Sequence, residues 1–121
     1  NMIIAVTAEG ETLGSPIDPR FGRASTFVVL DTETGVVRAL DNREAGSSGH
    51  GAGIQTARLM ADQGVHAVVT GHCGPNAFRA LRAAGIRVFT GITQGTGGDA
   101  AQQFQTGRLQ EAGAADVQSH W

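Results

Sequence analysis

The residues of this sequence that could do chemistry lie in glycine-rich turns, and Cys73 is the most reactive type among them. Cys73 is the only cysteine, and it stands between an apolar run and a segment that opens with Pro75. Proline is favoured at the first position of a helix, and a thiol near a helix N-terminus has a lowered pKa and is a good nucleophile or metal ligand. A buried, inert cysteine fits the same position, so both interpretations stay open.

Cys73 also begins a pattern that is typical of one enzyme class. In CGPNAFR, Cys73 and Arg79 have the spacing of a cysteine phosphatase loop, where N–H groups and arginine bind phosphate while a thiolate attacks it. However, Pro75 removes one N–H donor, Ala80 replaces the usual hydroxyl residue, and no aspartate is obviously placed as a general acid. A phosphatase-like enzyme is therefore an alternative and not the leading hypothesis.

Cations and imidazoles occur in the same kind of segment. Arg20 and Arg23 bracket Phe21 and Gly22, so an apolar contact lies between two cationic groups, while His50 lies among glycines and His72 precedes the cysteine. Arginine recognises anions, and histidine binds protons or metals. A solvated loop, with its phenylalanine at the edge of the core, would explain the first segment equally well.

The composition excludes several classes of function. All nine basic residues are arginine, so a P-loop lysine and Schiff-base chemistry are excluded. The net charge of −2 argues against a broad nucleic-acid-binding face, and the predicted strands lack the clustered carboxylates of a two-metal nuclease. A lone cysteine rules out an internal disulfide, and no apolar window would span a membrane. Because the apolar start lacks the features of a signal peptide, we expect a cytoplasmic protein.

An α/β fold must position these residues. Apolar, β-branched runs predict five strands, at residues 2–8, 25–31, 36–42, 65–70 and 86–90. Helical periodicity predicts three helices, at about residues 54–64, 75–84 and 96–106. The second and third strands flank Thr-Glu-Thr-Gly, which is typical of a hairpin, and Thr96 with Asp99 resembles a capping box.

The predicted element order is β-β-β-α-β-α-β-α. Alternating strands and helices require parallel strands with right-handed crossovers, whereas the hairpin adds an antiparallel strand. We therefore expect a three-layer α/β sandwich with a mixed five-stranded sheet. Residues 1–121 are expected to form a single domain, with a core at 2–109 and a loosely held tail at 110–121.

The carboxyl edge of such a sheet is where ligands bind. Here that edge collects the loops at residues 9–23, 43–53, 71–75 and 91–98. Helix N-termini at the same edge favour anions, although glycine-rich turns are also what tight strand–helix connections need. The residues alone thus predict an anion-binding edge and leave the anion unspecified.

Several motifs, taken in order, resemble the dinitrogenase iron–molybdenum cofactor biosynthesis family. They are IIAVTAEG, DPRFGRASTFVVLD, GHGAG, VVTGHCGPNAFRAL and VFTGITQGT. The similarity spans about Met2 to Leu109 and is strongest to small stand-alone members, which carry a molybdenum–copper sulfide cluster. The resemblance implies a ribonuclease-H-like fold and non-covalent binding of a preassembled, anionic cluster.

The resemblance also implies a set of cofactor-binding residues. These are Arg20, Phe21, Gly22, Arg23, His50, Gly51, Gly53, His72, Gly74 and Thr93. Cys73 stays a possible metal ligand, because soft Cu(I) prefers sulfur. The implied function is that of a cluster carrier or storage protein, not an enzyme, with a partner protein that takes part in cluster transfer or assembly. A third hypothesis is a metal-free protein-interaction module of the same fold.

Overall fold

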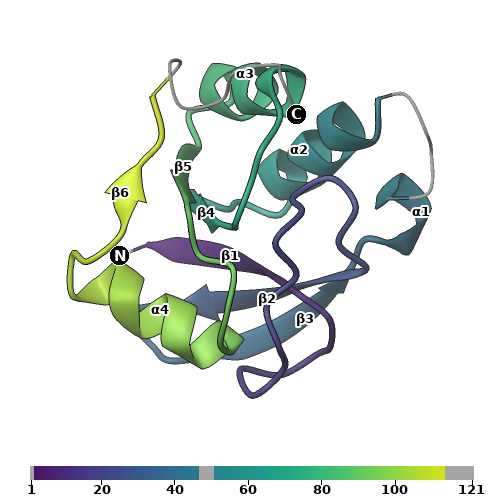
Figure 1. Ribbon diagram of the computed structural model, residues 1–121. Coiled ribbons are helices and arrows are strands. Elements are labelled where there is room, and N and C mark those ends of the chain that lie inside the picture. The colour runs from purple at the N-terminus through teal and green to yellow at the C-terminus, as the bar shows by residue number, and fades with distance from the viewer. Residues whose placement is uncertain (1, 47–50, 114–121) are drawn as a thin grey trace.

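The computed structural model describes residues 2–46 and 51–113, which form a sheet with helices on both faces (Figure 1). The strands are β1 (Ile3–Ala8), β2 (Thr26–Asp31), β3 (Val37–Asp41), β4 (Ala67–Val69), β5 (Arg87–Thr90) and β6 (Gln110–Glu111). The helices are α1 (Arg43–Gly46), α2 (Ala52–Asp62), α3 (Pro75–Ala83) and α4 (Gly97–Gln105). The protein is therefore an α/β protein, as the sequence predicts.

The sheet is mixed, with the strand order β3-β2-β1-β4-β5-β6. Strands β1, β4 and β5 are parallel to one another, while β2 is antiparallel to both β1 and β3. The predicted hairpin and the predicted parallel crossovers are both confirmed. Because the parallel strands all end at one edge, the loops after β1, β4 and β5 meet there, together with the N-termini of α2, α3 and α4.

The predicted count of five strands is wrong, because Gln110–Glu111 adds a sixth strand antiparallel to β5. Two residues carry no recognisable alternation, so the strand depends on a tertiary contact instead. Ala112 is 2% exposed, and its N–H donates to the carbonyl of Val88 at 2.8 Å. The expectation of a loose tail remains a prediction for residues 114–121, which lie outside the described residues.

A second difference lies in the loop predicted at residues 43–53. Its first residues form the short helix α1, and α2 begins at Ala52, two residues before the predicted start. The early start follows from Gly51, whose φ of +88° is open to glycine and strained for other residues. Asp41 and Arg43 stabilise the turn into α1 through an exposed ion pair of 2.9 Å.

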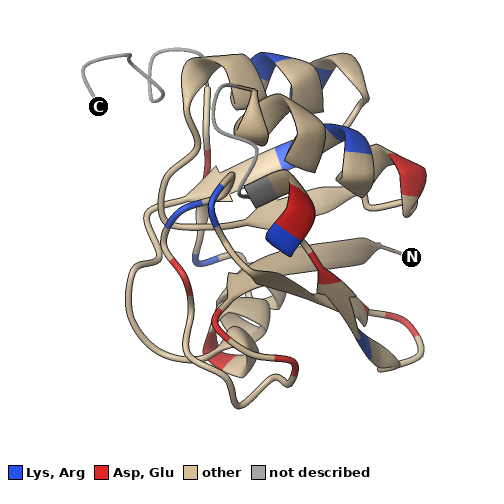
Figure 2. Cartoon of the chain, turned by 90° about the vertical axis from the view of Figure 1, so that its right-hand side faces the viewer, with Lys and Arg blue, Asp and Glu red and all other residues tan. Residues whose placement is uncertain are grey.

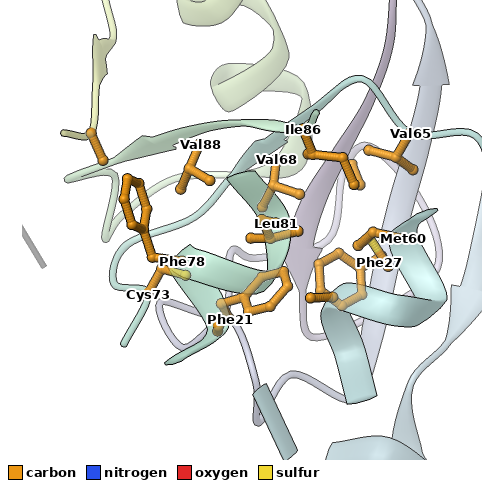
Figure 3. Close-up of a cluster of buried hydrophobic side chains, with 14 of the residues drawn as sticks. Phe21, Phe27, Met60, Val65, Val68, Cys73, Phe78, Leu81, Ile86 and Val88 are labelled. Carbon is orange, nitrogen blue, oxygen red and sulfur yellow. The ribbon is translucent and has the colours of Figure 1, made fainter. Parts of the chain in front are cut away.

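Each face of the sheet buries its own apolar cluster. One cluster lies under α2 and α3 and contains Phe21, Phe27, Met60, Phe78 and Leu81 (Figure 3). The other lies under α4 and is built from the opposite side chains of the same strands, including those of β1 at alternating positions. This two-sided burial explains the continuous apolar runs, which are typical of central parallel strands. Within the described part of the chain, no helix is long and apolar enough to cross a bilayer.

Close backbone packing at the carboxyl edge yields a stability prediction. A Cβ atom on Gly71 would lie 2.7 Å from the Cβ of Pro19 and 2.9 Å from the carbonyl oxygen of Ile92. Gly71→Ala should therefore lower the free energy of unfolding by about 1–3 kcal/mol, as measured by urea denaturation. Gly74→Ala is the matched control, because that position has an ordinary φ and no atom within 4 Å. Equal losses in both variants would contradict the packing argument.

Candidate anion-binding groove

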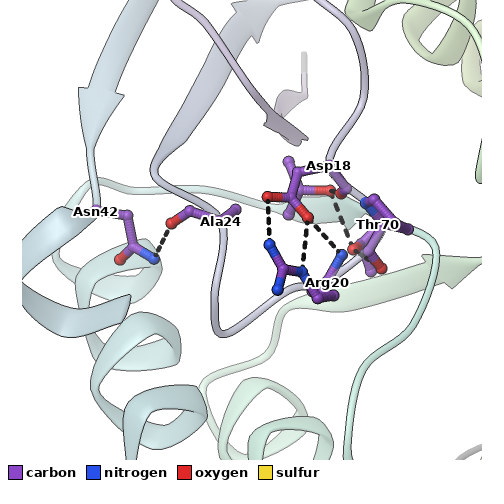
Figure 4. A network of polar contacts seen from close by, with 7 residues as sticks. Asp18, Arg20, Ala24, Asn42 and Thr70 are labelled. Atoms are coloured by element: carbon purple, nitrogen blue, oxygen red, sulfur yellow. Dashed lines mark hydrogen bonds and ion pairs between the residues drawn. The ribbon is translucent and has the colours of Figure 1, made fainter. Parts of the chain in front are cut away.

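The loop between β1 and β2 is held near its middle, just before its two arginines, by a buried polar network (Figure 4). The hydroxyl of Thr7 donates to the carbonyl of Asp18 and lies 3.0 Å from the hydroxyl of Thr70. The Thr70 hydroxyl in turn donates to the carbonyl of Pro19 at 3.5 Å. Both threonines are fully buried at the ends of β1 and β4. The loop is thereby tied to two adjacent strands before it reaches its arginines.

The next part of the loop is held by an aromatic side chain and by backbone pairing. Phe21 is 1% exposed and packs edge-on against Phe27, with ring centroids 5.6 Å apart. The backbone of His72 pairs with the loop on both sides of Arg20. The N–H of Phe21 donates to the carbonyl of His72, and the N–H of His72 donates to the carbonyl of Pro19. This arrangement matches the core-edge alternative for Phe21 and makes its side chain part of the core.

Three segments of this edge then converge on one groove. The groove has a volume of about 290 Å³ and lies between the loop and the first turns of α2 and α3. Its lining residues are Gly22, Arg23, Gly51, Ala52, Gly53, Ile54, Gly74, Pro75, Asn76 and Ala77. Five residues that the family resemblance implies for cofactor binding are brought together here, namely Gly22, Arg23, Gly51, Gly53 and Gly74.

Two glycines allow the walls to approach each other this closely. A Cβ atom on Gly22 would lie 3.0 Å from the Cα of Gly53, so the loop rests directly on the backbone of α2. A Cβ atom on Gly53 would lie 2.8 Å from the Cβ of Ala77, so α2 also rests on α3. Larger residues at either position would separate the walls.

The helix ends facing the groove carry N–H groups that the helices cannot satisfy. The first N–H groups of any helix have no intrahelical partner, and neither α2 nor α3 has a side-chain cap. By contrast, α4 has a complete capping box between Thr96 and Asp99, as the sequence predicts. The partial positive charge at two uncapped helix ends therefore faces the groove, which favours an anion there.

Neither the backbone conformation nor the packing at position 74 requires a glycine. Its φ of −69° and ψ of 166° are extended, and an added Cβ atom would have nothing within 4 Å. Serine, threonine, aspartate or asparagine would cap α3 at this N-cap position. Glycine leaves the helix end open and leaves space above it, which is a cradle that a side chain would fill.

The two arginines of the loop have different surroundings. Arg20 is paired with Asp18, with its Nε atom 3.3 Å from the carboxylate, and its side chain is 66% exposed against 9% for Asp18. Arg23 is exposed and is the only charged side chain among the described residues that line the groove. With an overall charge of −2, attraction of an anion has to come from this local arrangement. Figure 2 shows basic and acidic residues interspersed over the chain.

Cys73 directly precedes the groove residue Gly74, but its side chain points into the core. Its side chain is 1% exposed and lies beside Phe78 (Figure 3). Burial raises the pKa of the thiol to about 12, whereas a nucleophile needs a lowered pKa. Arg79 is exposed and hydrogen-bonds to Asn76 instead of facing the thiol. These features oppose the phosphatase pattern, which requires a thiolate and an arginine around one phosphate.

The remaining predicted residues lie elsewhere. His72 is half-buried next to the loop, and Thr93 is exposed in a separate depression with Arg108 beyond the end of β5. His50 lies outside the described residues. In the described segments, 2–46 and 51–113, no three His, Cys, Asp or Glu side chains are grouped so that they could hold a metal ion.

The sequence analysis missed the polar residues that hold the loop. Asp18 and Asn42 are both buried, with 6% and 1% exposure, and both accept or donate hydrogen bonds within this edge. An aspartate two residues before an arginine is a signal for a local turn. Nothing local marks the asparagine, because its partners lie 14 and 18 residues away.

The fold and the groove define a small α/β protein with a candidate anion-binding groove at paired helix N-termini. The chain belongs to the dinitrogenase iron–molybdenum cofactor family, which matches residues 2–107. It is similar to the apo form of the orange protein from Desulfovibrio gigas, with 44% identity, a TM-score of 0.90 and 92% of each chain covered. The resemblance drawn from the sequence motifs is confirmed.

Two further proteins show the same relationship. A NifB-like protein from Thermotoga has 33% identity and a TM-score of 0.81 over 92% of this chain and 93% of its own. An uncharacterized protein of Methanocaldococcus jannaschii is 32% identical over 79 residues, which are 64% of this chain and 67% of the relative. The family is thus one of cofactor-related binding proteins.

The burial of Cys73 can be tested by alkylation. Because the thiol is buried and its pKa is raised to about 12, iodoacetamide at pH 8 should leave the native protein unmodified over hours. The same reagent should modify Cys73 fully in urea, and mass spectrometry distinguishes the two outcomes. Rapid alkylation of the native protein would instead reveal an accessible thiolate and would revive a role for this residue in chemistry.

Proposed function

We propose that this protein binds a preassembled, anionic molybdenum–copper sulfide cluster non-covalently, as a carrier or storage protein and not as an enzyme. The cluster is its cargo, and a partner protein supplies or receives it. The family and the similarity to the orange protein support this class of cargo, and the three-layer mixed sheet supports a ribonuclease-H-like assignment.

One observation carries the proposal, which is the pair of uncapped helix ends facing one groove with open space above Gly74. A cluster whose metals are already bound to sulfide needs no ligands from the protein. It needs N–H donors, a compensating cation and apolar contact surface. The first turns of α2 and α3 supply the donors, although Pro75 has no N–H to give, and Arg23 supplies the cation.

The lining of the groove favours sulfur over oxygen on the anion. Of the ten residues that line it in the described part of the chain, eight are glycine, alanine, isoleucine or proline, and none of the ten carries a hydroxyl or a carboxylate. Removing an oxyanion from water against apolar carbon is costly unless every lone pair finds a donor. Sulfur is a weak acceptor and loses less in the same transfer. A thiometallate therefore fits these residues better than molybdate or phosphate does.

The burial of Cys73 in the core argues against its direct contact with the cargo. Copper ligation by its sulfur would require the thiol to leave the core and lose its proton. Any part that Thr93 or His72 plays would lie at the margin of the groove, since neither lines it.

Metal uptake by the apo protein tests the proposal. Incubation with tetrathiomolybdate and Cu(I), followed by gel filtration, should give a coloured protein with roughly stoichiometric molybdenum and copper, whereas molybdate should not be retained. Arg23→Gln should weaken uptake by about tenfold, because a hydrogen bond to a charged group contributes about 1.5–3 kcal/mol. Arg38→Gln is the matched control. Arg38 lies on the exposed strand β3, away from the groove, and donates a hydrogen bond to the side chain of Gln63 at the end of α2. Absence of metal in the wild type would refute the proposal.

Gly74→Ser should change stability and uptake in opposite directions. The serine hydroxyl would cap α3 and raise the free energy of unfolding by a few tenths of a kcal/mol. It would also occupy the N–H groups and the space that the cargo uses, so uptake should fall. Gly74→Ala fills the space without capping and should show an intermediate loss. Unchanged uptake in both variants would place the cargo elsewhere.

A further inference from the structure

Asn42 joins three segments that are far apart in the sequence. Its backbone N–H donates to the carbonyl of Ser25 at 2.8 Å, and its side-chain Nδ2 donates to the carbonyl of Ala24 at 2.9 Å (Figure 4). Its Oδ1 accepts from the hydroxyl of Thr56 in α2 at 3.2 Å. Asn42 is 1% exposed and Thr56 is fully buried, so these bonds form without competition from water.

The residues that Asn42 joins stand directly behind two walls of the groove. Ala24 follows Arg23 in the chain, and Thr56 lies one helical turn after Gly53. Arg23 and Gly53 both line the groove. The side-chain amide of Asn42 therefore bridges the residue after the loop arginine and the N-terminal half of α2.

The bonds of Asn42 add to the buried threonine network that holds the middle of the loop. Thr7 and Thr70 hold Asp18 and Pro19 against the sheet, but neither reaches α2. Gly22 contacts Gly53, and Phe21 packs in the same apolar cluster as Ala57 and Met60, so apolar contacts also join the loop to that helix. Such contacts have no fixed direction, whereas the hydrogen bonds of Asn42 to Ala24 and Thr56 fix an orientation.

We infer that Asn42 and Thr56 are positioning residues of the groove, which hold Arg23 at the distance from the N–H groups of α2 that a bridging anion needs. The inference rests on the proposed function for its ligand. A binding group held by buried hydrogen bonds presents its charge without losing freedom on binding, which strengthens affinity. Neither residue touches the groove, so their effect on binding is exerted through Arg23 and the first turn of α2.

Thr56→Val tests this inference, because valine matches the shape of threonine and lacks its hydroxyl. The affinity for tetrathiomolybdate with Cu(I), measured on fully folded protein, should fall by about tenfold, which is the scale of one misplaced charge-assisted bond. Thr56→Ser keeps the hydroxyl and should restore affinity to within about twofold of the wild type.

Thr32→Val is the matched control for a purely structural effect. Thr32 donates to the carbonyl of Met2 and accepts its N–H at the opposite edge of the sheet, so its loss should lower stability and leave affinity unchanged. Equal loss of affinity in Thr32→Val and Thr56→Val would overturn the inference, as would wild-type affinity in Thr56→Val.

Amide hydrogen exchange separates this inference from the proposed function. Without any cargo, Thr56→Val should speed exchange at the N–H groups of Asn42 and Gln55, which donate to the carbonyls of Ser25 and Gly51, relative to Thr32→Val, while the central strands stay protected. Failure of the wild type to bind the metals would refute the proposed function alone. Unchanged exchange at both of these N–H groups would refute the positioning role whatever the metal result.

Discussion

The backbone contact between the Arg20–Arg23 loop and the first turn of α2 is the constraint on which the rest of the site depends. Gly22 rests on the backbone of Gly53, and Gly53 rests on the methyl group of Ala77, so a loop and two helices meet with only that methyl group between them. Because the walls approach this closely, the open N–H groups of both helices and the guanidinium of Arg23 border the same small volume. Any added side chain at these contacts would widen the groove and weaken the positive electrostatic potential inside it.

The stability that this packing provides lets the helices begin without caps. An uncapped helix end forgoes a modest stabilisation that a serine or asparagine would supply. The chain uses that stabilisation at α4, where Thr96 and Asp99 cap each other, and forgoes it at both helices that border the groove. The difference coincides with the two helix ends at which an anion would complete the missing interactions.

Two residues that suggested reaction chemistry in the sequence, Cys73 and Arg20, do not line the groove. Cys73 is buried with a raised pKa, and Arg20 is paired with Asp18. Among the described residues, those that line the groove offer one cation, backbone N–H groups and apolar carbon. Such a lining suits the preformed anion that we propose as the cargo of this member of a family of cofactor-related binding proteins.

The sequence by itself determined the order of the five longer strands and three longer helices, the hairpin, the parallel crossovers and the edge at which the loops gather, because these follow from local periodicity, turn residues and chirality. It also identified the family, since several motifs recur in order along most of the chain. Only the tertiary structure decided that Arg23 and Gly74 face the groove while Phe21 and Cys73 face the core. It alone revealed the strand β6 and the hydrogen bonds by which Asn42 joins the loop to α2. These depend on contacts between residues far apart in the chain, and local patterns carry no record of which distant backbone will pack against which.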